Sequence, residues 1–182
     1  MKKQLFLTIL ILVFTIPVLS QETPPTADEI MSKAIEQASA ENKNIFLMFH
    51  ASWCGWCKRM DAAMKDEKTK DYFNDHYVTI HMVVKESANN KHLENPGASE
   101  LLAKYKGDRA GIPFWLIFDK NGELIEDSFM KTERNGEMVD SNIGCPAQDN
   151  EVDVFVSKIN KAAKLTDTEK ENIITRFRAN RN

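Results

Sequence analysis

The sequence predicts an α/β fold whose central mixed β-sheet carries helices on both faces. Segments whose apolar residues recur at helical spacing alternate with short apolar or β-branched runs, and strands joined through helices pair in parallel. An Asn-Gly turn at 121–122 joins two further strand-like runs and adds an antiparallel pair. The chain of 182 residues is 42% hydrophobic and 28% charged, which suits one globular domain with its own core.

The first elements are marked by a capping box and by apolar runs. Thr26 stands three residues before Glu29, so each side chain can bond the other's backbone N–H at a helix start. This helix is predicted to run from Thr26 to about Asn42. The next predicted elements are, in order, a buried strand over 45–49, a helix from 54 to about 72, and a second strand over 77–84.

Turn residues and amphipathic spacing divide the second half of the chain. The polar segment 85–97 contains Asn-Asn and Pro-Gly pairs and is predicted to be a loop. The elements predicted after it are a short helix over 98–106, a strand over 113–118, a hairpin turn over 119–122, a partner strand over 123–130, a turn or insertion over 131–136, an amphipathic helix over 152–163, and a last helix that a second capping box begins at Thr166.

The N-terminus has the pattern of a secretory signal peptide. Lys2 and Lys3 precede an almost wholly apolar run over 5–16, and small residues near Ser20 fit cleavage before Gln21. An uncleaved anchor is the alternative, but the run is short against the roughly 20 residues of a spanning helix. No membrane span is therefore expected after cleavage. The predicted division is 1–20 signal peptide, 21–25 leader, 26–165 α/β domain and 166–182 C-terminal helix extension.

Cys54 and Cys57 carry the strongest chemical signal. Disulfides persist outside the cytosol, but a bridge over three residues would constrain the unfolded chain little. A cysteine at the first turn of a helix has its pKa lowered from about 8.5 by one to several units, because the helix start favours the thiolate. Trp53 and Trp56 flank the pair with apolar surface on which an extended chain could dock; ordinary packing is the alternative.

A metal site is the main competitor for the pair. Structural zinc needs four ligands, typically from two such pairs, and the third cysteine, Cys145, stands alone. The four histidines have no close metal spacing with the pair, and c-type haem attachment would need His where Lys58 stands. We therefore expect no metal and no cofactor.

Two stretches, "IFLMFHASWCGWCK" at 45–58 and "GIPFWLIFDKNGE" at 111–123, resemble the thioredoxin superfamily. The chain looks most like exported bacterial thioredoxin-like (thiol:disulfide interchange) proteins, and the resemblance covers about residues 27–163. It implies a thioredoxin-like three-layer sandwich for the domain at 26–165.

The resemblance also assigns roles. It implies that Cys54 attacks a substrate disulfide and that Cys57 resolves the mixed disulfide. It implies a cis peptide bond before Pro113, with Ile112 and Pro113 facing the cysteines as substrate-binding residues beside Trp53 and Trp56. A proline there leaves no backbone N–H unpaired.

The sequence departs from the family pattern at two positions. Thioredoxins bury a carboxylate six residues before the first cysteine, and here that position is Met48. The lysine that partners this acid aligns with His81. Asp61, one helical turn after Cys57, is a candidate for the missing proton acceptor, and a solvated helix face is the alternative.

We therefore expect an exported thiol–disulfide oxidoreductase, periplasmic or, as the second choice, secreted. Ile112 before the proline resembles reducing family members, so reduction of protein disulfides is the predicted direction. The expected partners are exported protein thiols or disulfides and an electron donor. The formal net charge of −3 gives no reason to expect nucleic acid. The alternative is a thioredoxin-fold binding module that grips an exported partner or a metal with little turnover.

Two interpretations of Cys145 are open. If Gly144 matches the glycine that lies beside the cis-proline loop in thioredoxins, Cys145 is on the rim around Cys54 and can exchange with the pair. Otherwise it is a small buried filler at a turn, as free cysteines commonly are.

Overall fold

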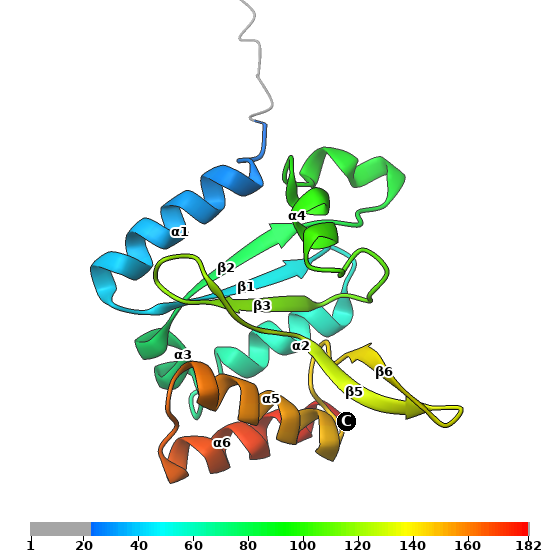
Figure 1. Cartoon of the computed structure of the whole chain (residues 1–182). Coiled ribbons are helices and arrows are strands. Elements are labelled where there is room, and N and C mark those ends of the chain that lie inside the picture. The colour runs from blue at the N-terminus through cyan, green and yellow to red at the C-terminus, as the bar shows by residue number, and fades with distance from the viewer. Residues whose placement is uncertain (1–22, 182) are drawn as a thin grey trace, which may run out of the picture.

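The computed structural model of the chain describes residues 23–181 (Figure 1). The predicted signal peptide at 1–20 lies outside these residues. The helices are α1 (Ala27–Glu41), α2 (Gly55–Met64), α3 (Lys70–His76), α4 (Ala98–Lys104), α5 (Asp149–Ala162) and α6 (Asp167–Arg178), with short 3₁₀ helices η1 (Ala88–Leu93) and η2 (Ala179–Arg181). The strands are β1 (Asn44–His50), β2 (Tyr77–Val83), β3 (Phe114–Phe118), β4 (Leu124–Asp127), β5 (Phe129–Arg134) and β6 (Glu137–Asn142).

The central sheet has the strand order β2-β1-β3-β4. β1 and β2 are parallel, whereas β3 runs antiparallel to both β1 and β4. The predicted mixed sheet is confirmed, including the antiparallel pair across the Asn-Gly turn. β1 is an inner strand, and the chain that leaves its end forms the loop over residues 51–54 that leads to α2; this is called the reactive loop because it carries Cys54.

Alternation along β1 builds a core on each face of the sheet. Ile45, Leu47 and Phe49 point to one face, where α1 and α4 cover them. Phe46 and Met48 point to the other face, where α2, α3, α5 and α6 cover them (Figure 1). Successive side chains of a strand face opposite sides, so an unbroken apolar run is what a doubly covered strand requires. The predicted three layers are confirmed.

Both predicted capping boxes form. The Thr26 hydroxyl accepts from the Glu29 N–H at 3.2 Å while the Glu29 carboxylate accepts from the Thr26 N–H at 2.8 Å. Thr166 and Glu169 make the same reciprocal pair at the start of α6. α6 is predicted as an extension, and its Phe177 is fully buried against α5 in the same core as the sheet.

The helix predicted from 54 to about 72 is wrong, because the segment forms two helices. The buried Thr69 hydroxyl donates to the Ala63 carbonyl, which turns the chain between α2 and α3. This hydrogen bond satisfies a carbonyl at the end of α2 that has no partner within the helix.

The strand predicted over 123–130 is interrupted, and the turn predicted over 131–136 is part of a second hairpin. β5 and β6 pair through Asn135 and Gly136, both at positive φ, as a type I′ turn requires. Met130 is the one buried residue of these two strands, so they lack the apolar alternation by which a strand is recognised. The hairpin projects from the body of the molecule (Figure 1).

None of the helices within residues 23–181 has the length and apolar character needed to cross a bilayer.

Candidate active site

Cys54 and Cys57 form a disulfide at the start of α2, with 5.3 Å between their Cα atoms. The first helical residue is Gly55, so Cys54 is the N-cap and not part of the first turn. The Cys57 backbone N–H donates to the Cys54 sulfur at 3.1 Å. The free N–H groups and the dipole of a helix start stabilise an anion, so this sulfur is placed where a thiolate is favoured.

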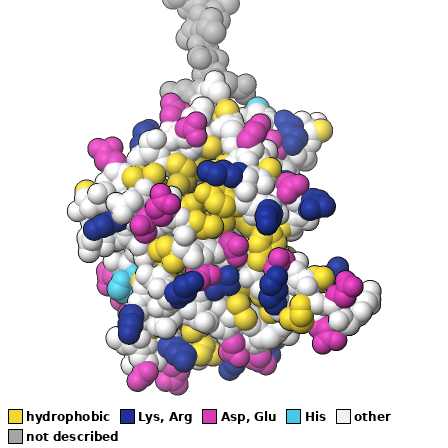
Figure 2. Space-filling view, in the orientation of Figure 1, with side chains coloured by type: hydrophobic (Ala, Val, Ile, Leu, Met, Phe, Trp, Pro, Cys, Tyr) yellow, Lys and Arg dark blue, Asp and Glu magenta, His cyan; other side chains and the backbone are white. Residues whose placement is uncertain are grey.

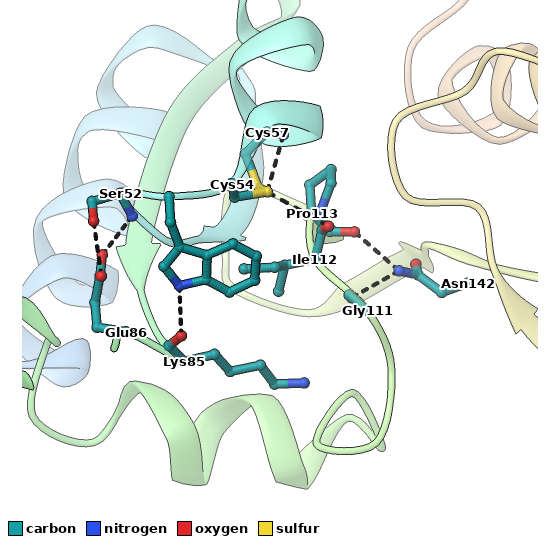
Figure 3. Close-up of a disulfide and its surroundings, with 10 residues drawn as sticks. Ser52, Cys54, Cys57, Lys85, Glu86, Gly111, Ile112, Pro113 and Asn142 are labelled. Atoms are coloured by element: carbon teal, nitrogen blue, oxygen red, sulfur yellow. Dashed lines mark hydrogen bonds between the residues drawn. A yellow bond between two sulfur atoms is a disulfide. The ribbon is translucent and has the colours of Figure 1, made fainter. Parts of the chain in front are cut away.

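The segment before β3 lies against the disulfide. The Ile112–Pro113 peptide bond is cis, as the resemblance implies. The Ile112 carbonyl oxygen lies 3.6 Å from the Cys54 sulfur (Figure 3). The Ile112 side chain packs against the small buried cluster that Ala51 forms with the two cysteines. A molecule whose sulfur reaches Cys54 therefore meets the backbone of this loop.

Asn142, at the end of β6, holds the same loop. Its amide donates to the Gly111 carbonyl at 2.9 Å and to the Pro113 carbonyl at 3.0 Å (Figure 3). This residue is not among the predicted site residues, because no sequence pattern predicts the hairpin that carries it.

Both tryptophans of the motif present surface to solvent. Trp53 is 58% exposed and Trp56 48% exposed. The Trp53 indole N–H donates to the Lys85 carbonyl at 2.9 Å, and the Arg59 guanidinium lies 4.8 Å from the centroid of the Trp56 ring. These contacts hold the two rings beside the disulfide without burying them.

Glu86 is a second residue that the sequence analysis missed. It is only 5% exposed, and its carboxylate accepts from the backbone N–H and the hydroxyl of Ser52 (Figure 3). Burial by itself would raise the pKa of Glu86, but the hydrogen bonds from Ser52 outweigh it, so the pKa lies below its usual value. The reactive loop is thus tied to the segment that follows β2.

The pattern of a thioredoxin-like family matches residues 27–120, which is just over half of the chain. The chain belongs to the thioredoxin-like family. A C-x-x-C disulfide at the start of a helix, beside a cis-proline loop, is the part of this thioredoxin-like fold that is equipped for thiol–disulfide exchange.

Two curated relatives match the region of the motif. Protein disulfide-isomerase A2 of Mus musculus is 46% identical over 61 residues, covering 29% of this chain. The Homo sapiens protein of the same name is 41% identical over 64 residues, covering 32% of this chain. In each case the match spans 12% of the relative's own length.

Solved structures give more extended but more distant matches. A disulphide isomerase from Xylella fastidiosa Temecula1 is 18% identical with a TM-score of 0.45, over 84% of this chain and 88% of that one. A structure described as DsbH oxidoreductase is 21% identical with a TM-score of 0.38, over 91% of this chain and 96% of that one.

One of the two departures from the family pattern, His81, belongs to a polar cluster beside the core. Met48 is fully buried and pairs in register with His81 on β2. His81 Nε2 lies 2.9 Å from Asp61 Oδ1, and the His50 ring centroid is 5.2 Å from that of His81. Burial raises the pKa of Asp61, but the hydrogen bond and charge of His81 outweigh it and leave the pKa below its usual value. Asp61 is therefore engaged by His81 and is not simply solvated.

Gly144 and Cys145 lie beside the cis-proline loop of the thioredoxin-like domain. A Cβ on Gly144, whose φ is 63°, would stand 3.5 Å from the Pro113 carbonyl oxygen. Cys145 shares with Trp56 and Ile112 the lining of a cavity of about 280 Å³, yet only 6% of it is exposed. Burial raises the pKa of the Cys145 thiol to about 12. Cys145 therefore lies near the cis-proline loop, as the first of the two interpretations requires, but its thiol has the properties of the buried filler described by the second.

Asn180 covers the Cys145 sulfur. Its side-chain amide donates to the sulfur at 3.3 Å and to the Pro146 carbonyl at 3.2 Å.

Within residues 23–181, no group of three or more His, Cys, Asp or Glu side chains is arranged to hold a metal ion.

Proposed function

We propose that this thioredoxin-like chain is an exported thiol–disulfide oxidoreductase that reduces disulfides in other exported proteins. The observation that carries the proposal is the position of Cys54: an N-cap sulfur that accepts a backbone hydrogen bond, within 3.6 Å of the Ile112 carbonyl oxygen. A sulfur so placed favours the thiolate and meets a backbone to which a substrate strand can pair.

The reaction has two exchange steps. The Cys54 thiolate attacks one sulfur of the substrate disulfide, forms a mixed disulfide and releases the other substrate sulfur as a thiolate. The Cys57 thiolate then attacks the Cys54 sulfur, which closes the Cys54–Cys57 disulfide and releases the second substrate thiolate. The two electrons gained by the substrate come from the protein dithiol, and an external dithiol donor restores it by the reverse exchange.

The substrate contacts are assigned to the surface around the disulfide. Trp53 and Trp56 supply exposed aromatic area, and Ile112 and Pro113 supply the backbone and apolar contact beside Cys54. The support is proximity: all four residues are contributed by the reactive loop, α2 and the segment before β3.

Export rests on the N-terminal pattern of basic residues, apolar run and small residues at 1–20. The periplasm is the first choice of compartment and secretion the second. Expression of the full chain in a bacterial host, with fractionation and N-terminal sequencing, tests this: a mature protein that begins near Gln21 outside the cytosol is expected, and an uncleaved cytosolic protein contradicts export.

The alternative function is a binding module with little turnover. It is favoured by the apolar Met48 in place of a buried acid and by the two exposed tryptophans. Insulin reduction with a dithiol donor separates the two functions. We expect turnover with the wild type and with Cys145→Ala, and none with Cys54→Ser. A wild-type rate equal to that of Cys54→Ser would favour the binding module.

A further inference from the structure

A groove separate from the disulfide opens between the segment after α4, strands β4 and β5, the end of β6, and α5. Its volume is about 1080 Å³. Figure 2 shows one face of the molecule, with hydrophobic side chains at its centre and both basic and acidic side chains around them. The groove lies outside the contacts assigned to the exchange reaction.

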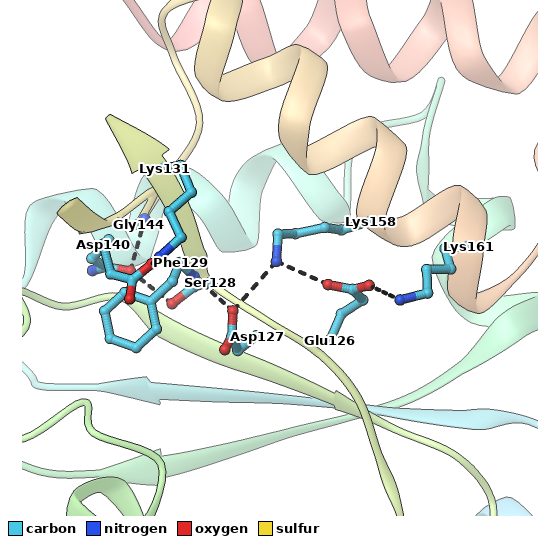
Figure 4. Close-up of polar contacts among 10 residues, drawn as sticks. Glu126, Asp127, Ser128, Phe129, Lys131, Asp140, Gly144, Lys158 and Lys161 are labelled. Atoms are coloured by element: carbon cyan, nitrogen blue, oxygen red, sulfur yellow. Dashed lines mark hydrogen bonds and ion pairs between the residues drawn. The ribbon is translucent and has the colours of Figure 1, made fainter. Parts of the chain in front are cut away.

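Basic side chains outnumber acidic ones in the lining of the groove. The two carboxylates in its lining are already paired: Asp127 with Lys158 at 3.3 Å and Asp140 with Lys131 at 2.8 Å (Figure 4). Four further cations line it and have no carboxylate partner within residues 23–181, namely Lys104, Lys106, Arg109 and Arg134. The chain as a whole has a formal net charge of −3, so this positive region is local.

Apolar side chains also line the groove. Leu124 is 43% exposed, and Phe129 and Val154 are partly buried beside it. A small inorganic anion would leave this surface uncovered. An extended chain that carries both apolar and acidic side chains would fill it and meet the cations on either side.

One end of the groove reaches the cis-proline loop. Gly111 lines the groove and directly precedes Ile112, and the Asn142 amide joins the two sites by bonding the Gly111 and Pro113 carbonyls. The Lys85 ammonium donates to the Ala110 carbonyl at 2.6 Å, which fixes the loop that carries Arg109. A polypeptide whose sulfur is at Cys54 can therefore continue past Gly111 into the groove.

We propose that this groove binds an acidic, extended segment of the protein whose disulfide Cys54 reduces. The inference rests on the proposed exchange function and adds a substrate class to it: proteins with a run of Asp or Glu close to the reactive disulfide. Attraction to the groove raises the rate at which such substrates meet Cys54.

The test uses two peptides that differ only in charge. Each carries one cysteine in a mixed disulfide with 2-mercaptoethanol, followed by a tail of Glu residues or of Gln residues. At low ionic strength the wild type is expected to reduce the Glu-tailed peptide about tenfold faster, and the advantage should shrink at about 0.5 M NaCl because salt screens the attraction. Equal rates for the two peptides would overturn the proposal.

Two triple variants with the same change in net charge locate the effect. Lys106→Gln, Arg109→Gln and Arg134→Gln remove the groove cations, whereas Lys33→Gln, Lys68→Gln and Lys170→Gln change exposed lysines elsewhere. The groove triple variant should lose the Glu-tail advantage and the control triple variant should keep it. Equal loss of the Glu-tail advantage in both triple variants would assign the effect to net charge and overturn the assignment of binding to the groove.

A small uncharged probe and a direct binding measurement separate this proposal from the exchange function. Bis(2-hydroxyethyl) disulfide should react equally with the wild type and both triple variants; no reaction with any of them contradicts the exchange function itself. Fluorescence anisotropy of a labelled, cysteine-free Glu peptide on the oxidised protein should show binding that only the groove triple variant loses. Tighter binding of a single-stranded oligonucleotide than of this peptide would overturn the assignment to a protein segment.

Discussion

The buried carboxylate of Glu86 accepts hydrogen bonds from both the backbone N–H and the hydroxyl of Ser52, with 2.8 Å between Ser52 Oγ and Glu86 Oε2. Ser52 lies two residues before Cys54, and the neighbouring Trp53 indole bonds the Lys85 carbonyl. The loop that presents the reactive sulfur is thus fixed by two adjacent residues that follow β2 (Figure 3).

We predict that Glu86→Gln lowers the free energy of unfolding of the oxidised protein by about 1–3 kcal/mol at pH 7, because a charged acceptor of two hydrogen bonds is replaced by a neutral group. Urea denaturation measures the change. The exposed Glu36→Gln is the matched control and should stay within about 0.5 kcal/mol of the wild type. A Glu86 variant as stable as that control would show that the hydrogen bonds to Ser52 add nothing to the free energy of unfolding.

The same contact makes the stability of the folded protein depend on pH. The folded-state pKa of Glu86 lies below its unfolded value of 4.5, so its contribution is complete above pH 4.5 and is lost as the pH falls through the lower, folded-state pKa. The stability difference between the wild type and Glu86→Gln should therefore shrink in acid. A difference that grows as the pH falls below 4.5 would contradict the assignment.

Asp61 is predicted to act on stability more than on exchange. Its pKa is lowered by His81, so Asp61→Asn should cost about 0.5–1 kcal/mol above the unfolded value of 3.8 and progressively less below it. A role of Asp61 as the proton acceptor for Cys57 is tested by stopped-flow measurement of the step in which Cys57 resolves the mixed disulfide. A slowing of about a hundredfold or more, as is typical when a general acid or base is lost, would instead make Asp61 the proton acceptor.

Cys145 should resist alkylation in the folded protein. Because burial raises its pKa to about 12, the thiol stays protonated at pH 8, and Asn180 covers the sulfur. Peptide mapping after iodoacetamide should find Cys54 modified in the reduced protein and Cys145 modified only after denaturation. Asn180→Ala should speed Cys145 modification in the folded state. A fast reaction of Cys145 in the wild type would restore the view that it exchanges with the pair.

The parts of this fold that the sequence predicts are those with a local pattern. The capping boxes at Thr26 and Thr166, the apolar run of β1, the Asn-Gly turn and the cysteine pair each depend on residues a few positions apart. The resemblance then supplied the relation between Cys54 and Pro113, which are distant in sequence and which no periodicity joins.

The missed residues depend on contacts between distant segments. Glu86 stands in a polar stretch predicted as a loop, and its role depends on hydrogen bonds from Ser52, which is 34 residues away in the sequence. Asn142 acts on Gly111 from a hairpin whose exposed strands lack apolar alternation. The break between α2 and α3 depends on the Thr69 hydroxyl, and threonine within a helical pattern does not by itself indicate one.

The proposed exchange depends on one assignment of roles, in which Cys54 attacks and Cys57 resolves. Intact-mass measurement of Cys57→Ala and Cys54→Ala, each reduced and then mixed with bis(2-hydroxyethyl) disulfide at pH 7, tests it most directly. We predict that Cys57→Ala accumulates one mixed disulfide, mapped to Cys54, and that Cys54→Ala forms it much more slowly at Cys57. A faster adduct at Cys57, or no adduct in either variant, would contradict the claim.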